Sequence, residues 1–100
     1  MALKKILPTE HPYIVKVEGV CGGSPIIKGT RTPVKSIVCH YKMGETADEI
    51  VENLPFLNHA QVYDALSYYY DHIEEIDKEI EMDEEEYWMK IYPPTIKKYQ

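Results

Sequence analysis

Twelve consecutive residues, 23–34, constrain the fold more than any other segment of this chain. Residues 25–28 include two adjacent isoleucines, which favours a short buried strand. Gly29 can adopt the positive φ that a sharp corner requires. Thr32 is a good N-cap, and Pro33 suits the first position of a helix because a proline there loses no hydrogen bond. The segment therefore predicts a strand, a corner and the start of a helix.

The flanking sequence extends this pattern into a small, mainly helical unit. Residues 13–18 alternate loosely and predict a strand, which would form a β-hairpin with residues 25–28. A first helix is expected over residues 34–43, ended by Gly44. Thr46 and Glu49 form a capping box that opens a short second helix.

A third helix is expected from residue 59 to about residue 82, capped by Asn58. Its apolar positions recur at helical spacing, as in a helix packed on two others; they are Val62, Leu66, Tyr69, Ile73, Ile76 and Ile80. The predicted fold class is therefore mainly α, with a tri-helical core, a small N-terminal β-hairpin and a long third helix. Residues 1–82 would form this domain, and residues 83–100 an acidic and aromatic C-terminal tail.

Length and composition predict a single globular domain. The chain has 100 residues, of which 44% are hydrophobic, enough for one small core. No apolar run is long enough to span a bilayer and no signal peptide follows Met1, so we expect a cytoplasmic protein without a membrane partner. Cys21 and Cys39 lack the spacing of a disulfide framework, and reduced thiols fit best.

Charge is divided unevenly along the chain. Residues 1–44 hold seven Lys and Arg against two acids, a net charge of +5, whereas residues 45–100 hold four lysines against fifteen acids, a net charge of −11. Such a division suggests one face for a polyanion and another for a basic or metal-binding partner. Ordinary solvated faces are an equally good interpretation.

The second and third helices form a helix-turn-helix candidate, whose third helix would enter the major groove of DNA. His59 and Gln61 would then face the bases, together with Asp64 and Tyr68 as outward residues. The best candidates for phosphate contacts lie in the basic N-terminal half; they are Lys28, Arg31 and Lys35. The alternative for Arg31 is a structural role at the corner, bonded to backbone carbonyls or to an acid of the second helix.

No catalytic, metal-binding or cofactor-binding motif stands out in the sequence. The phosphate-loop spacing is absent and the four histidines are dispersed. His72 lies beside Asp71 and Glu75, but an imidazole beside acids on an exposed face is more often solvated than a metal ligand. We therefore expect no enzyme, no metal and no cofactor.

Aromatic residues suggest protein contacts. Tyr63 and Tyr70 lie seven residues apart on one stripe of the third helix, which is typical of a contact surface and favours a homodimer through this helix. A larger monomer core that includes the hairpin is the alternative. In the tail, Trp88 and Tyr92 could anchor a segment that folds onto a partner, or they could fold back across their own domain.

Residues at fixed offsets from residue 23 to residue 69 resemble a known family. The motif begins Gly-x-Pro-x-Ile-x-Gly-Thr-Arg-x-Pro-Val at Gly23 and continues with Gly44-Glu45-Thr46, Glu49-Ile50, Leu54-Pro55, Leu57, Gln61-Val62, Ala65-Leu66 and Tyr68-Tyr69. It is similar to the family catalogued as domain of unknown function 433. The resemblance implies a homeodomain-like helix-turn-helix core, an antitoxin role of VapB type and a partner with a PIN-like ribonuclease fold.

The resemblance and the residues together give two functional hypotheses. In the first, the chain is an antitoxin-like DNA-binding regulator that binds its own operator and neutralises a PIN-like toxin, with the tail as the toxin-binding element. In the second, it is a protein-interaction module, for dimerisation or as an adaptor, that does not bind DNA.

Overall fold

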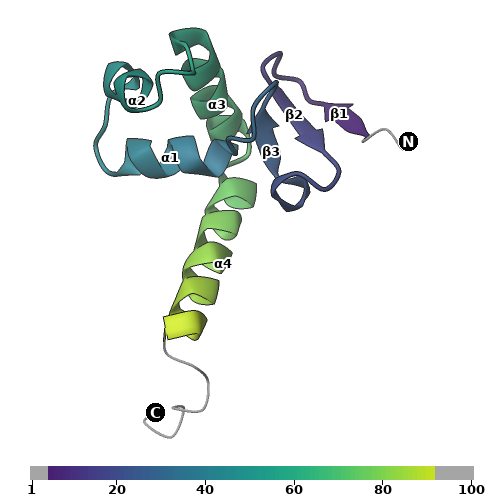
Figure 1. Cartoon of the computed structure of the whole chain (residues 1–100), viewed down its shortest axis with the longest axis vertical. Coiled ribbons are helices and arrows are strands. Elements are labelled where there is room, and N and C mark those ends of the chain that lie inside the picture. The colour runs from purple at the N-terminus through teal and green to yellow at the C-terminus, as the bar shows by residue number, and fades with distance from the viewer. Residues whose placement is uncertain (1–4, 92–100) are drawn as a thin grey trace, which may run out of the picture.

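The fold combines a small antiparallel sheet with helices that cover one of its faces, as the computed structural model shows (Figure 1). The structure describes residues 5–91, and side chains up to Glu84. The described elements are β1 (Ile6–Pro8), β2 (Ile14–Val17), the 3-10 turn η1 (Cys21–Gly23), β3 (Pro25–Ile27), α1 (Val34–Lys42), α2 (Ala47–Asn53), α3 (His59–Asp71) and α4 (Ile73–Ile91).

The sheet has the strand order β1-β2-β3, with both pairs antiparallel. Ile14 pairs with Ile27, so the predicted hairpin is confirmed. The prediction of two strands was nevertheless incomplete, because Ile6 pairs with Val17 and adds β1 as an edge strand. All of β1 is exposed and it ends at a proline, so it lacks the buried alternation that marks a strand in a sequence.

The corner between β3 and α1 follows the prediction in outline but not in its cap. Gly29 has φ of 82°, the left-handed conformation that a side chain would resist. Thr32 was expected to cap α1, but its carbonyl accepts a hydrogen bond from Ile27 N at 2.9 Å. Because this bond holds Thr32 beside β3, Pro33 becomes the N-cap residue, without a side-chain capping bond.

The expected capping box at Thr46 and the expected N-cap at Asn58 are both present, and Asn58 also forms a capping box with Gln61. Thr46 Oγ1 accepts from Glu49 N at 3.2 Å, and Glu49 Oε1 accepts from Thr46 N at 2.9 Å. Asn58 Oδ1 accepts from Gln61 N at 2.9 Å, and Gln61 Oε1 accepts from Asn58 N at 2.8 Å. These reciprocal bonds fix where α2 and α3 begin.

We expect Thr46→Ala and Asn58→Ala each to lower the free energy of unfolding by about 1 kcal/mol. Each substitution leaves one first-turn N–H without its side-chain acceptor. Urea titration followed by circular dichroism measures the change, with Ser67→Ala, an exposed change in the middle of α3, as the control. A loss as small as that of the control would show that these caps contribute nothing.

The predicted long third helix is two helices, and this part of the fold prediction was wrong. His72 has φ of −137° and ψ of 46°, which ends α3 and lets α4 start in another direction. The apolar periodicity continues across this break, because Ile76 in α4 is as fully buried as Val62 in α3. α4 also continues past residue 82, where the sequence analysis placed the start of the tail.

The core lies between the three-helix unit α1–α3, the inner face of the sheet and the first turns of α4. Its largest fully buried side chain is Tyr68, at 1% exposure. Tyr68 was expected to face outward, and that prediction was wrong because β2 and α4 cover this side of α3. Tyr69, predicted to face inward, is buried at 7% exposure.

Candidate functional site

Two histidines and four carboxylates meet where the N-terminal turn crosses the end of α3. Glu10 and His11 lie in the turn between β1 and β2, whereas the remaining members belong to α3, α4 and the residue between them. The full cluster consists of Glu10, His11, Asp64, Asp71, His72 and Glu75. Segments about sixty residues apart in the sequence thereby form one polar site.

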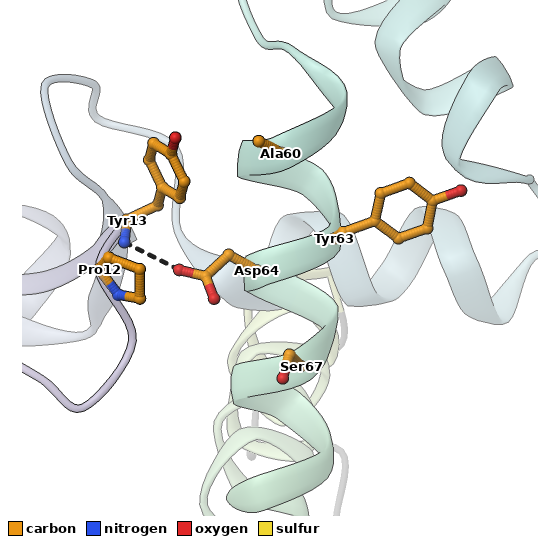
Figure 2. A pocket seen from close by; sticks show the side chains of 6 residues that line it. All are labelled: Pro12, Tyr13, Ala60, Tyr63, Asp64 and Ser67. Atoms are coloured by element: carbon orange, nitrogen blue, oxygen red, sulfur yellow. Dashed lines mark hydrogen bonds between the residues drawn. The ribbon is translucent and has the colours of Figure 1, made fainter.

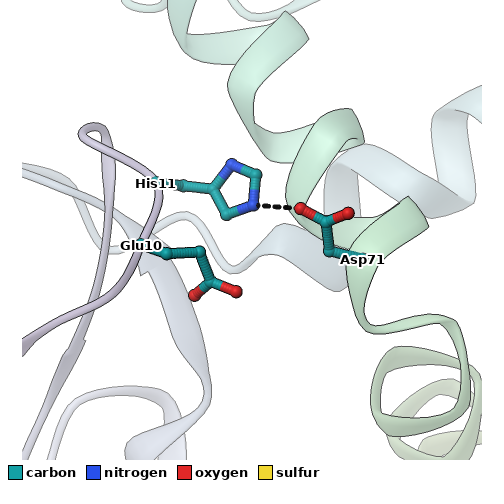
Figure 3. A group of neighbouring side chains, drawn as sticks. All are labelled: Glu10, His11 and Asp71. Atoms are coloured by element: carbon teal, nitrogen blue, oxygen red, sulfur yellow. Dashed lines mark hydrogen bonds and ion pairs between the residues drawn. The ribbon is translucent and has the colours of Figure 1, made fainter.

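His11 is the centre of this His–carboxylate cluster. Only 8% of the residue is exposed, and its ring is held from both sides. Nδ1 lies 3.1 Å from Asp64 Oδ1. Nε2 lies 2.8 Å from Asp71 Oδ2, and Figure 3 shows this second contact. Because an ionised carboxylate only accepts hydrogen bonds, this arrangement favours the imidazolium form of His11, in which both ring nitrogens donate.

Burial and charge act in opposite directions on the His11 pKa. Burial disfavours the imidazolium and is the largest single effect, but the hydrogen bonds to Asp64 and Asp71 outweigh it, so the pKa is raised above its ordinary value. A hydrogen bond from its own backbone N–H and the contact with His72 lower the pKa of Glu10. His72 Nε2 lies 2.8 Å from Glu10 Oε2.

The Tyr68 ring packs against both histidines of the cluster and forms its apolar side. Its ring stacks on His72 with centroids 4.2 Å apart and meets the His11 ring edge-on at 5.4 Å. Burial, and next the nearby Glu75 carboxylate, raise the pKa of the Tyr68 hydroxyl. The tyrosine is therefore neutral and shields one side of both imidazoles from water.

Asp64 joins the cluster to an open pocket beside it. Its Oδ2 accepts the Tyr13 backbone N–H at 2.8 Å, which fixes the N-terminal turn against α3 (Figure 2). The pocket has a volume of about 300 Å³, and Figure 2 shows its lining residues, Pro12, Tyr13, Ala60, Tyr63, Asp64 and Ser67. Asp64 was expected to point outward, but its side chain is only 14% exposed because the turn covers it.

Acidic side chains of α4 pair with the lysines of the basic N-terminal half. Lys35 Nζ lies 2.9 Å from Asp83, Lys42 Nζ lies 2.7 Å from Asp77, and Lys16 Nζ lies 3.4 Å from Glu75. Acidic residues of α4 thus face three of the N-terminal lysines within the molecule. Lys35, one of the expected phosphate contacts, is consequently occupied by a carboxylate.

The other two expected phosphate contacts remain exposed. Lys28 and Arg31 lie on the loop between β3 and α1, and neither forms an ion pair with any residue between 5 and 84. Lys28 and Arg31 thus share the exposed loop between β3 and α1, whereas Lys35 pairs with Asp83.

The expected base-reading residues on α3 have internal partners. His59 Nε2 lies 2.6 Å from Asp48 Oδ1, and the Gln61 amide oxygen is used in the cap of α3. A side chain that must first give up such a partner contacts DNA at an added cost. The helix that precedes α3 is also acidic, because α2 carries Asp48, Glu49 and Glu52.

The expected partner-binding tyrosines are exposed. Tyr63 is 59% and Tyr70 is 55% exposed, and the Tyr70 hydroxyl lies 2.6 Å from that of Tyr41 on α1. Trp88 lies within α4, but its side chain is outside the described set, and Tyr92 lies outside the described residues.

We expect acid to weaken the contact between α4 and α1. The hydrogen bonds from Lys42 and then Tyr69 lower the pKa of Asp77 below its ordinary value of 3.8. A group with a lowered folded-state pKa stabilises the fold fully above its unfolded pKa and loses this effect as the pH falls through the folded value. The contribution of Asp77 should therefore disappear as the pH falls below about 4. Urea midpoints between pH 5 and pH 2.5 should fall less in Asp77→Asn than in the natural chain, and equal falls would contradict the expectation.

Sequence reasoning missed the His–carboxylate cluster. It considered His72 with its near neighbours Asp71 and Glu75, but His11 is separated from Asp64 and Asp71 by 53 and 60 positions. No local spacing signals such a pairing. The available hint was the Glu10-His11 dipeptide in a segment that precedes a strand.

The fold and the cluster define a small, mainly helical class of protein, in which a three-helix unit carries a three-stranded sheet on one side and a fourth helix at its end. The chain belongs to the family described as Protein of unknown function (DUF433), whose model matches residues 14–69. The matched residues run from the start of β2 into the last turn of α3 and exclude Glu10, His11, Asp71 and α4.

A solved structure supports the same membership. The crystal structure of a DUF433 member protein from Anabaena variabilis is similar with a TM-score of 0.64 and 37% sequence identity, covering 68% of this chain and 67% of that chain. No curated protein matches the sequence. Within the described residues, no helix combines the length and the apolar character needed to cross a bilayer.

Proposed function

We propose that this chain is the antitoxin-like member of a toxin–antitoxin pair and acts mainly by protein contact, neutralising a PIN-like nuclease. The observation that supports this role is α4, a charged helix that extends away from the three-helix unit (Figure 1). Ile80 packs against the core and Asp83 pairs with Lys35. Beyond these contacts the helix continues to Ile91 and carries Trp88 in its sequence. The nature of the partner comes from the family resemblance.

The part of α4 that extends away from the three-helix unit is the surface we propose for the partner. A helix that leaves the body of a protein offers a continuous face to a groove in a partner. Trp88 lies on this helix and Tyr92 directly follows it, and both residue types are enriched at the centres of protein interfaces. In this role Tyr63 and Tyr70 form a separate surface on α3, suited to a second copy of the chain in a homodimer.

The experiment compares the natural chain with a chain that ends at Glu84, each co-expressed with the product of the neighbouring gene, which the proposal expects to be a PIN-like nuclease. Ending at Glu84 keeps the Lys35–Asp83 ion pair, so the body should fold. We expect capture of the nuclease and inhibition of its RNA cleavage by the full chain only. Trp88→Ala should weaken capture by about ten-fold or more, whereas Phe56→Ala, an exposed aromatic at 61%, should not. Equal capture by both chains would end the proposal.

Operator binding by a homeodomain-like helix-turn-helix, formed by α2 and α3, is a second function that one observation favours. Lys28 and Arg31 are exposed at the corner and have no acidic partner between residues 5 and 84. Against it, Lys35, His59 and Gln61 have internal partners. We therefore propose that any DNA contact rests on phosphate attraction at the corner more than on base reading by α3.

A mobility shift on the DNA upstream of the gene separates a DNA-binding antitoxin from a pure interaction module. We expect binding that weakens steeply with salt, and a salt slope that falls by about 1 for each of Lys28→Ala and Arg31→Ala. Lys78→Ala, an equal change of charge on the exposed side of α4, is the matched control. Absence of a shift at low salt would leave the protein-interaction module without DNA binding. Neither role requires catalysis by this chain.

A further inference from the structure

Three metal-ligating side chains converge at the centre of the His–carboxylate cluster. Glu10, His11 and Asp71 each offer one ligand atom, and these atoms all lie within 4.8 Å of one another. Figure 3 shows the Glu10 and His11 side chains extending from the N-terminal turn toward Asp71 on α3. Glu10 and Asp71 are exposed whereas His11 is buried, so solvent reaches the group at its two carboxylates.

A fourth side chain gives His11 the orientation of a metal ligand. Asp64 Oδ1 accepts from His11 Nδ1 at 3.1 Å, and the same carboxylate is fixed by the Tyr13 backbone N–H at 2.8 Å. This pairing leaves Nε2 as the nitrogen that faces Asp71 and Glu10. Metal-binding histidines usually donate their second ring N–H to a carboxylate or carbonyl, which fixes the tautomer and the ring. Asp64 already fills that role.

We propose that Glu10, His11 and Asp71 form a site for a divalent transition metal of the zinc type. His11 Nε2 and one carboxylate oxygen each from Glu10 and Asp71 are the ligands, and water completes the tetrahedron on the exposed side. The metal takes the place of the proton between Nε2 and Asp71, and that proton passes to solvent. The 2.8 Å between these two atoms then widens to about 3.4 Å, the separation of two ligands at zinc-bond distances.

The chemistry of the donor set favours this class of ion. One imidazole nitrogen with two carboxylate oxygens suits zinc and its first-row neighbours, whereas Ca²⁺ and Mg²⁺ prefer oxygen ligands alone. His72 lies 2.8 Å from Glu10 Oε2 and positions that carboxylate from the α3–α4 break. The bound ion would therefore join the N-terminal turn to the point where α4 begins. This site does not depend on the proposed antitoxin role.

The test is calorimetric titration of the full, untagged chain with ZnCl₂, together with the visible spectrum of the Co²⁺-loaded chain. We expect one ion per chain and the d–d bands of a tetrahedral nitrogen and oxygen site. His11→Gln and Asp71→Asn should each abolish saturable binding. Asp64→Asn should weaken it by about ten-fold to a hundred-fold while keeping the ligands.

Control variants outside the proposed site should leave zinc binding unchanged. His59→Gln alters another histidine–aspartate pair, the one with Asp48, and should leave zinc affinity unchanged, as should Cys21→Ser. Glu10 and Asp71 are exposed, so Glu10→Gln and Asp71→Asn test the site even if His11→Gln fails to fold. Lack of saturable binding by the natural chain, or undiminished binding by Asp71→Asn and Glu10→Gln, would overturn the proposal.

Discussion

Replacement of Tyr68 by alanine is expected to lower the free energy of unfolding by about 3–5 kcal/mol. Tyr68 is the largest fully buried side chain of the described residues, at 1% exposure. Its ring stacks on His72 and contacts the edge of His11, so its removal leaves a cavity beneath the cluster and takes support from α4. Since a domain of this size is stabilised by only about 5–15 kcal/mol, a measurable unfolded fraction is expected at 37 °C.

Two further variants distinguish the effect of removing the buried Tyr68 ring from the effect of removing any tyrosine of α3. Tyr63→Ala removes the same side chain from the same helix, but Tyr63 is 59% exposed, and the loss should stay within about 0.5 kcal/mol. Tyr68→Phe keeps the ring and should cost about 1 kcal/mol or less, because the hydroxyl is 3.4 Å from Glu75. Urea unfolding followed by fluorescence measures all three. Similar losses for Tyr63→Ala and Tyr68→Ala would contradict the observed packing.

Asp64→Ala should have the next largest effect, a loss of about 2–3 kcal/mol. The substitution removes the acceptor of the Tyr13 backbone N–H and one of the two partners of His11. It leaves a buried ring with an unpaired N–H, and it frees the N-terminal turn from α3. Unfolding in chelator-treated buffer at pH 6 measures the loss under conditions in which His11 is protonated.

Asp48→Ala is the matched control for Asp64→Ala. Asp48 also pairs with a histidine, His59, but its side chain is 86% exposed, and exposed pairs contribute at most about 1 kcal/mol. Asp64→Asn should lie between the two, because its amide oxygen can still accept from Tyr13 N. If Asp64→Ala cost no more than Asp48→Ala, the N-terminal turn would not be anchored by this carboxylate.

Local patterns predicted the parts of the fold that depend on neighbouring residues. Thr46 and Asn58 were recognised as caps because capping bonds join residues three positions apart. The corner at Gly29 and the pairing of residues 13–18 with 25–28 were also recognised, because a turn residue and two strands that follow one another are visible in the local sequence. Failures occurred where a contact outside these short patterns decided the outcome. Thr32 pairs with Ile27 and so cannot cap α1.

The candidate site was less predictable than the fold. Lys35 was predicted as a phosphate contact, and its ion pair with Asp83 on α4 was not foreseen. Tyr68 was expected to face outward, but β2 and α4 bury it. The division of charge along the chain is visible in the sequence. Whether those charged residues face solvent or pair with each other depends on the tertiary structure. Spacing along a sequence contains no information on that question.

The sequence by itself determined the starts of α2 and α3, the corner between strand and helix, and the membership of the family, because each depends on residue types at short, fixed offsets. Only the tertiary structure decided that the helix breaks at His72 and that acids of α4 pair with Lys16, Lys35 and Lys42. It alone also placed His11 between Asp64 and Asp71. The physical reason is that these contacts join segments far apart in the chain, and the packing of the core fixes which of them meet.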